Sequence, residues 1–214
     1  MATHVAHSPT MRYPIAATLM ALAPAPLTAA PGEIPLVAIG LPFTPESPKP
    51  VVPTHALRDR IAIGEIEGLP ATVGSSKFNW IAAAKRSSIN AALRESFHRM
   101  NMLAPDDASA RHRLTVSWVG SHTPFRIATR NSGTVTMHYR LVRIDSGQLL
   151  FDRDISTSAE GGGADASMRD NGIVRAAIAA NFASAANCLD RAAYGEAPAD
   201  CALKPSFQVS VVRR

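Results

Sequence analysis

Residues 135–151 read Val-Thr-Met-His-Tyr-Arg-Leu-Val-Arg-Ile-Asp-Ser-Gly-Gln-Leu-Leu-Phe, and they carry the clearest structural signal in this 214-residue chain. Apolar and polar side chains alternate over residues 134–145, and a second alternating run follows over residues 148–158. This two-residue period is typical of strands with one buried face. Between the runs, Asp145-Ser146-Gly147 is a tight-turn signal. The stretch therefore predicts an antiparallel β-hairpin.

The patterns on either side of this hairpin predict the remaining elements. Alternating runs predict strands over residues 60–66 and 113–122, and an edge strand in the tail at 206–212. Apolar residues at helical spacing predict two long helices, over residues 76–102 and 165–191. The order β-α-β-β-β-α predicts an α/β (α+β) two-layer sandwich, with both helices on one face of a mainly antiparallel sheet. The opposite face would carry polar strand residues, namely Thr115, Ser117, Thr136, His138 and Arg140.

The N-terminal segment has the layout of a secretory signal peptide. Arg12 precedes an apolar, alanine-rich stretch, and no acidic residue occurs before Glu33. We expect a signal peptide over residues 1–29, starting at Met1 or Met11 and cleaved after Ala29, and hence a periplasmic protein. No Cys follows the apolar run, so we expect no lipid attachment at a lipobox.

A proline-rich segment follows the expected cleavage site. Seven prolines lie between residues 31 and 53, and proline favours extended chain. We interpret residues 30–56 as an extended arm or linker, either free or docked on the domain. Residues 57–214 then form a single α/β domain with a C-terminal tail.

The chain has two cysteines, Cys188 and Cys201. In an oxidising compartment, an even pair at short separation favours a disulfide, which would pin the tail to the last helix. Two unpaired thiols are the alternative. With no His nearby, the pair makes a poor zinc site.

Charge and motifs limit the function classes. The formal net charge is +5, but the basic residues are scattered, which argues against nucleic-acid binding and leaves peripheral contact with an anionic membrane open. Gly161-Gly162-Gly163-Ala164-Asp165-Ala166 fits a dinucleotide fingerprint only formally, and a loop between strand and helix is the simpler reading. Asp152 and Asp154 fit a solvated strand better than an acid–base pair. We therefore expect no catalytic, cofactor or metal site, and a protein that is not an enzyme.

The loop over residues 121–133 is the best candidate for partner contact. Loops on rigid scaffolds often carry function, and aromatic side chains together with arginine are common at interface hot spots. We expect the contact residues to be Phe125, Arg126, Ile127 and Arg130.

Three stretches carry a family resemblance. They are the helix end at residues 91–104, the hairpin at 135–151, and Ala176-Ala177-Ile178-Ala179-Ala180-Asn181-Phe182. Over residues 57–191 the chain resembles periplasmic α/β domains of ABC-transport auxiliary proteins and of the TolB amino-terminal type. Some similar proteins carry the label UDP-N-acetylglucosamine acyltransferase, but the hexapeptide repeats of that chemistry are missing here. Many members of these families are lipoproteins, and this chain lacks the required cysteine.

The resemblance implies a non-catalytic periplasmic cell-envelope domain that binds a protein or lipid-transport partner. Two alternatives stay open: an envelope enzyme, either acyltransferase or hydrolase, and a purely structural domain that forms oligomers.

Overall fold

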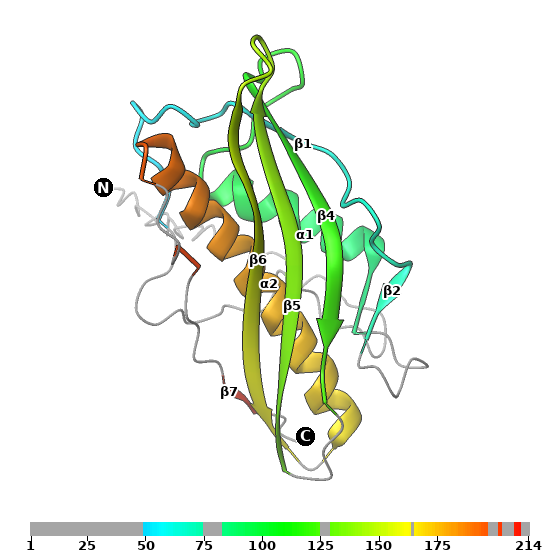
Figure 1. Ribbon diagram of the computed structural model, residues 1–214. Helices are drawn as coiled ribbons and strands as arrows, with labels where there is room; N and C mark the ends of the chain where they lie inside the picture. Colours follow the sequence, from blue (N-terminus) through cyan, green and yellow to red (C-terminus); the bar gives the residue numbers. More distant parts are fainter. Residues whose placement is uncertain are drawn as a thin grey trace, which may run out of the picture.

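The computed structural model describes residues 49–74, 83–124, 129–163, 165–196, 201–202 and 208–210, the last three by their backbone (Figure 1). Within these residues the chain forms a five-stranded sheet, a two-stranded hairpin and two helices. In chain order the elements are β1 (Ile61–Ile63), β2 (Thr72–Val73), β3 (Ala84–Lys85), α1 (Arg86–Arg99), β4 (His112–His122), β5 (Arg130–Arg143), β6 (Leu149–Gly162), α2 (Ala166–Ala193) and β7 (Gln208–Ser210).

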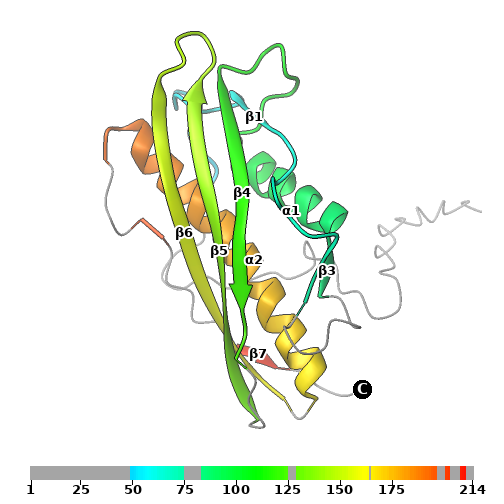
Figure 2. The ribbon, with the colours of Figure 1, turned by 45° about the vertical axis from the view of Figure 1, so that its right-hand side comes forward.

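The large sheet has the order β1-β4-β5-β6-β7, with antiparallel pairing in its centre. β1 and β7 lie at the edges and run parallel to β4 and β6. Leu114 lies opposite Leu141, and Leu141 lies opposite Phe151, so the buried apolar side chains of three strands share one face. Both helices lie on that side of the sheet (Figure 2). The predicted two-layer α+β sandwich is confirmed.

The first helix starts later than the sequence pattern predicts. Ala84 and Lys85 belong to β3, which pairs with β2, and Ala83 N–H donates to the carbonyl oxygen of Val73 at 2.7 Å. Ala83 and Ala84 are buried. Because this pairing satisfies the main chain and buries both side chains, it overrides the helix propensity of the alanine run. The rest of the expected extension, residues 76–82, lies outside the described residues.

The glycine triplet does not end the last long strand where we expected. Gly161 and Gly162 are part of β6, paired with Asn131 and Arg130 of β5. A Cβ atom on Gly161 would lie 2.6 Å from Cγ1 of Ile173 in α2. Glycine is therefore needed here because the helix crosses close to the strand.

α2 is the core helix of the domain. It is long and apolar enough to span a bilayer, but 83 % of its most apolar window is buried inside the protein. Its predicted apolar stripe is buried, as are the polar side chains of Arg169, Arg175 and Asn181. Asn181 Nδ2 donates to the carbonyl oxygen of Ile155 at 2.8 Å, which ties the helix to β6.

The described end of the proline-rich arm, residues 49–56, packs on the domain. Val51 is buried, and its N–H donates to the carbonyl oxygen of Met100 at 2.9 Å. His55 is also buried, with Nε2 3.0 Å from Oδ1 of Asp190 near the end of α2. Core packing therefore begins before Leu57 and includes Val51.

Cys188 and Cys201 form the predicted disulfide, with an S–S distance of 2.05 Å and a Cα–Cα distance of 4.9 Å. Asn187 Nδ2 also donates to the carbonyl oxygen of Cys201 at 2.7 Å. Covalent and hydrogen bonds thus fix the segment at Cys201 against the last turns of α2.

Candidate functional site

The two helices leave the outer face of the sheet centre uncovered (Figure 2). Its side chains point away from the core because successive strand residues alternate between faces. They are half-buried or exposed, and all are polar, as the sequence predicted for this face. We call this set the open face: Thr115, Ser117, Thr136, His138, Arg140, Asp152, Asp154 and Ser156.

His138 is the centre of the open face. Its Nδ1 lies 2.8 Å from Oδ1 of Asp154, and its Nε2 lies 2.8 Å from Oδ1 of Asp152. Arg140 Nε lies 4.0 Å from Oδ2 of the same Asp152. An imidazolium ring can donate to both carboxylates at once, whereas a neutral ring can donate to one. The arrangement fixes the His138 ring across two neighbouring carboxylates of β6.

Further hydrogen bonds hold the polar side chains around His138. Thr136 Oγ1 donates to Oγ of Ser156 at 3.0 Å, across β5 and β6. Ser117 Oγ donates to Oε2 of Glu67 at 3.1 Å, which links β4 to the segment after β1. The open face is therefore a pre-ordered polar surface with donors and acceptors at fixed positions, and such surfaces suit recognition more than the enclosure of an apolar ligand.

The predicted contact loop, residues 121–133, is shorter than expected, since β4 extends to His122 and β5 begins at Arg130; residues 125–128, with Phe125, Arg126 and Ile127, lie outside the described residues. Its two ends are fixed. Thr123 is buried, and Pro124 accepts a hydrogen bond at 2.8 Å from Nδ2 of Asn131. Arg130 is exposed at the start of β5, opposite Gly162. The structure thus places Arg130 at one end of the sheet, and the contact role of all four residues stays a prediction.

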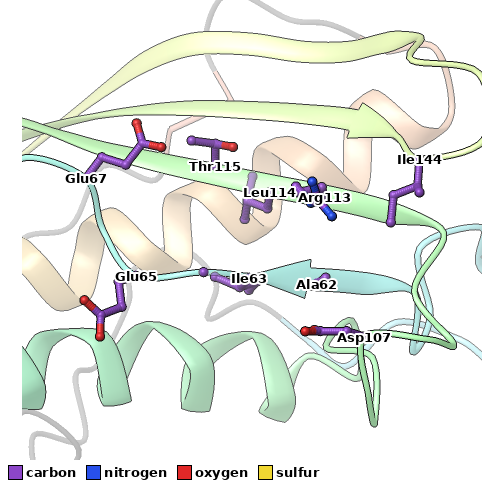
Figure 3. A pocket seen from close by; sticks show the side chains of 10 residues that line it. Ala62, Ile63, Glu65, Glu67, Asp107, Arg113, Leu114, Thr115 and Ile144 are labelled. Carbon is purple, nitrogen blue, oxygen red and sulfur yellow. The ribbon is translucent and has the colours of Figure 1, made fainter.

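A first hollow, of about 370 Å³, lies beside β1, on the same side of the sheet as the open face (Figure 3). Its charged lining consists of three carboxylates and one guanidinium, from Glu65, Glu67, Asp107 and Arg113. Figure 3 shows the carboxylates spread around the rim and not converging on one point. Consistent with this, no group of three His, Cys, Asp or Glu residues in the described part of the chain is placed to hold a metal ion.

A second hollow, of about 530 Å³, lies on the helix side at the opposite end of the sheet from the glycines of β6. We call it the cationic hollow because three arginines and one aspartate are its charged residues. Its lining is Ala56, Leu57, Arg60, Arg111, His112, Leu141, Arg143, Asp145, Leu150, Ala192 and Ala193.

His112 is the buried polar residue of the cationic hollow. It is 9 % exposed, and its Nδ1 has no hydrogen-bond partner among the described residues. Burial lowers the pKa of its imidazole, and the positive charges of Arg143 and Arg60 lower it further, while Asp145 acts in the opposite direction. The neutral ring is therefore favoured more than in water.

The sequence predicted Asp152 and Asp154 only as members of a solvated strand, and it gave no signal for the cationic hollow. The hairpin turn alone would not have shown the pairing of His138 with Asp154, because an irregularity between Leu141 and Val142 shifts the register by one residue. Arg60, Arg111 and Arg143 come from three separate segments, so no local motif brings them together.

Comparisons with known proteins give a fold and no family. No family model matches the chain, and no curated protein matches it. Among solved structures, a Xanthomonas campestris protein of family DUF330 has a TM-score of 0.51 and 7 % identity, covering 70 % of this chain and 95 % of that one. A hypothetical protein from Chlamydia trachomatis has a TM-score of 0.47 and 8 % identity, with coverage of 64 % and 99 %. A candidate lipoprotein from Caulobacter crescentus has a TM-score of 0.39 and 14 % identity, with coverage of 65 % and 93 %.

The first of these similarities places the chain among proteins that share this α+β sandwich. At such low identity it defines the class of fold and nothing about activity.

Proposed function

We propose that the chain is a non-catalytic domain of the bacterial cell envelope that binds a protein partner through its open face. The observation that carries this proposal is the fixed polar array around His138, whose ring bridges Asp152 and Asp154. Groups held in place before binding lose little entropy when a partner docks, so such an array favours specific recognition.

The shape of the surface supports the same function. Three long strands form the open face without a described element above it, and its side chains offer both charges and hydroxyl groups. A partner with complementary charges would pair with these groups, and such pairing contributes more to the specificity of a complex than to its affinity. The loop with Phe125, Arg126 and Ile127, followed by Arg130, adjoins β4 and β5 and would extend the contact.

An envelope location is part of the proposal. It is supported by the signal-like residues 1–29 and by the disulfide between Cys188 and Cys201, a bond that persists in oxidising compartments. Mass spectrometry of the protein from its native host tests this part. We expect a mature chain that starts at Ala30 in the periplasmic fraction, and an uncleaved chain in the cytosol would contradict it.

Site-specific photo-crosslinking tests the binding surface. A photoreactive amino acid replaces Thr136, in the centre of the open face, and in a matched variant it replaces the exposed Arg191 on α2. After irradiation of intact cells, we expect one discrete heterologous adduct from position 136 and none from position 191. Adding His138→Gln should reduce the adduct, because it breaks the bridge to both carboxylates.

The alternatives give different results in the same experiment. An adduct that contains two copies of this chain would favour a structural, oligomer-forming domain. Equal adducts from both positions, or no adduct from position 136, would contradict a binding role for the open face.

A further inference from the structure

The cationic hollow has features of a ligand site that the proposed partner surface does not use. It lies behind the sheet, where α2 ends and where the hairpin joins β5 to β6; Figure 1 shows these two features at the same end of the molecule. It is therefore separate from the open face, and a ligand bound there would not need the protein partner.

The main chain fixes the positions of the three arginines. The carbonyl oxygen of Arg60 accepts hydrogen bonds from the N–H groups of Arg111, at 2.8 Å, and His112, at 3.0 Å. Arg143 lies directly opposite His112 in the pairing of β4 with β5. Arg60 and Arg111 directly precede β1 and β4, and Arg143 is the last residue of β5, so three cationic side chains start from neighbouring backbone positions.

The charges of the hollow are unbalanced. Among its lining residues, three arginines face one acid, Asp145, which gives a formal excess of +2. Asp145 is already paired with Arg143, whose Nη2 donates to Oδ2 at 3.0 Å. Arg60 and Arg111 are exposed and remain available for an anion. Guanidinium groups bind phosphate through paired N–H bonds, and they do so better than an ammonium group because of their planar fork.

The floor of the hollow adds a buried hydrogen-bonding group. His112 lines the hollow, is nine-tenths buried, and has an Nδ1 atom without a partner among the described residues. A buried polar atom without a partner lowers stability, so such atoms in native proteins call for an explanation. A ligand oxygen near the imidazole would supply a polar neighbour at this point.

The other wall of the hollow is apolar. Leu57 and Leu141 are buried core residues, while Leu150, Ala192 and Ala193 are half-buried at its edge. A small inorganic anion would use the arginines and leave this wall in contact with water. A volume of about 530 Å³ is within the usual range of roughly 300–1,000 Å³ for small-molecule sites.

We propose that the cationic hollow binds a phosphate-bearing amphiphile. Arg60 and Arg111 hold the phosphate group, His112 lies beside it, and the wall of Leu57, Leu141 and Leu150 covers the first carbons of an acyl chain. The phosphate could belong to a membrane lipid or to a soluble phosphate compound, and the experiment separates these sources.

The test is a titration of the purified mature protein, followed by NMR of labelled backbone amides. Three probes are compared: dihexanoyl phosphatidic acid below its micelle concentration, inorganic phosphate, and dihexanoylglycerol, which has the same chains without the phosphate. We expect saturable shifts at Arg111, His112 and Arg143 with phosphatidic acid. Inorganic phosphate should bind at the same residues at least about tenfold more weakly, because it cannot use the apolar wall.

Two variants test whether the arginines of the hollow bind the phosphate group. Arg60→Gln/Arg111→Gln should weaken phosphatidic acid binding by about tenfold or more, since two charge-assisted contacts are lost. Arg113→Gln is the matched control, because Arg113 is also exposed and lies on β4 but on the opposite face of the sheet. It should bind as the wild type does. Circular dichroism melting of each variant verifies that it is folded.

Several results would overturn the proposal. If phosphatidic acid produces no saturable shifts, the hollow is not a phosphate site. If inorganic phosphate binds as tightly as phosphatidic acid, the ligand is a free phosphate and not an amphiphile. If dihexanoylglycerol binds equally well, or if the double arginine variant binds normally, the cationic side chains play no part.

Discussion

The phenol of Tyr139 donates a hydrogen bond of 2.7 Å to Oδ1 of Asn181, and both side chains are fully buried. Asn181 Nδ2 in turn donates to the carbonyl oxygen of Ile155 and to Oγ1 of Thr157, at 2.8 and 3.2 Å. A polar contact thus joins β5, β6 and α2 in the middle of an apolar core. Because buried polar groups are costly without partners, this contact fixes how the helix sits on the sheet.

The first prediction follows from this contact. Tyr139→Phe keeps the ring but removes the donor to Asn181, whose buried Oδ1 then has one partner fewer. We expect the free energy of unfolding to fall by about 1–3 kcal/mol, measured by urea denaturation. The control is Tyr194→Phe, at a residue that is 63 % exposed, where we expect a change within about 0.5 kcal/mol. Equal effects of the two substitutions would contradict the structural role of the contact.

The disulfide gives a second prediction. Replacing Cys188 and Cys201 together with alanine removes a bond that closes a loop with a sequence separation of 13. The chain-entropy model assigns a loop of this length roughly 3 kcal/mol, so we expect the free energy of unfolding to fall by about that amount. The wild-type protein in reducing agent should then resemble the double variant. If reduction leaves the wild-type stability unchanged, the bond contributes no stability.

The sequence predicted the sheet better than it predicted the polar interior. The hairpin with Tyr139 and Phe151 was recognisable because alternation in a half-buried strand depends only on local geometry. Asn181, Arg169 and Asp170 were not recognisable as core residues. Their burial depends on partners from distant strands, such as Tyr139 for Asn181 and Asn131 for Asp170. A periodicity that counts apolar residues treats these side chains as the solvent-exposed side of the helix.

The candidate sites were predicted only in part for the same reason, because local patterns can be recognised in the sequence and contacts between distant segments cannot. Strand alternation predicted five residues of the open face, namely Thr115, Ser117, Thr136, His138 and Arg140. The bridge from His138 to Asp152 and Asp154 depends on the cross-strand register. The cationic hollow needs the parallel pairing of β1 with β4, which places Arg60 next to Arg111. Parallel pairing joins segments about fifty residues apart, and no local pattern encodes it. The early strand β3 was missed because Ala83 and Ala84 favour a helix when considered alone.

His112 makes stability depend on pH. Burial, together with Arg143, lowers the pKa of His112 in the folded protein, while in the unfolded chain it stays near the ordinary value of about 6.5. As the pH falls below about 6.5, the unfolded chain therefore binds a proton that the folded protein binds less readily. The free energy of unfolding contributed by this group is lost as the pH falls from about 6.5 through the lowered folded-state pKa.

The measurement compares wild type with His112→Gln by urea denaturation at pH 7.5 and 5.5. The variant should lose less stability than the wild type between these two pH values, because it lacks the titrating group. The exposed His122 supplies the control: His122→Gln should keep the wild-type pH dependence. If His112→Gln has the same pH dependence of stability as the wild type, the buried imidazole of His112 does not contribute to that dependence.

The last prediction concerns the crossing of β6 and α2. Gly161 is buried against Ile173, and an added Cβ would lie 2.6 Å from Cγ1 and 2.9 Å from Cδ1 of that residue. Both distances are shorter than real Cβ contacts, so Gly161→Ala must push the helix away from the strand or distort Ile173. Overpacking of this kind costs about 1–3 kcal/mol. Gly120→Ala is the matched control, since a Cβ there meets nothing within 4 Å.

A double-mutant cycle with Ile173→Ala separates the clash from other effects of the alanine. Ile173→Ala alone leaves a cavity and should destabilise the protein, but in that background Gly161→Ala should cost less than in the wild type, because its Cβ then occupies the vacated space. If the cost of Gly161→Ala is the same with and without Ile173, the two residues do not interact and the close crossing is not what requires glycine in this strand.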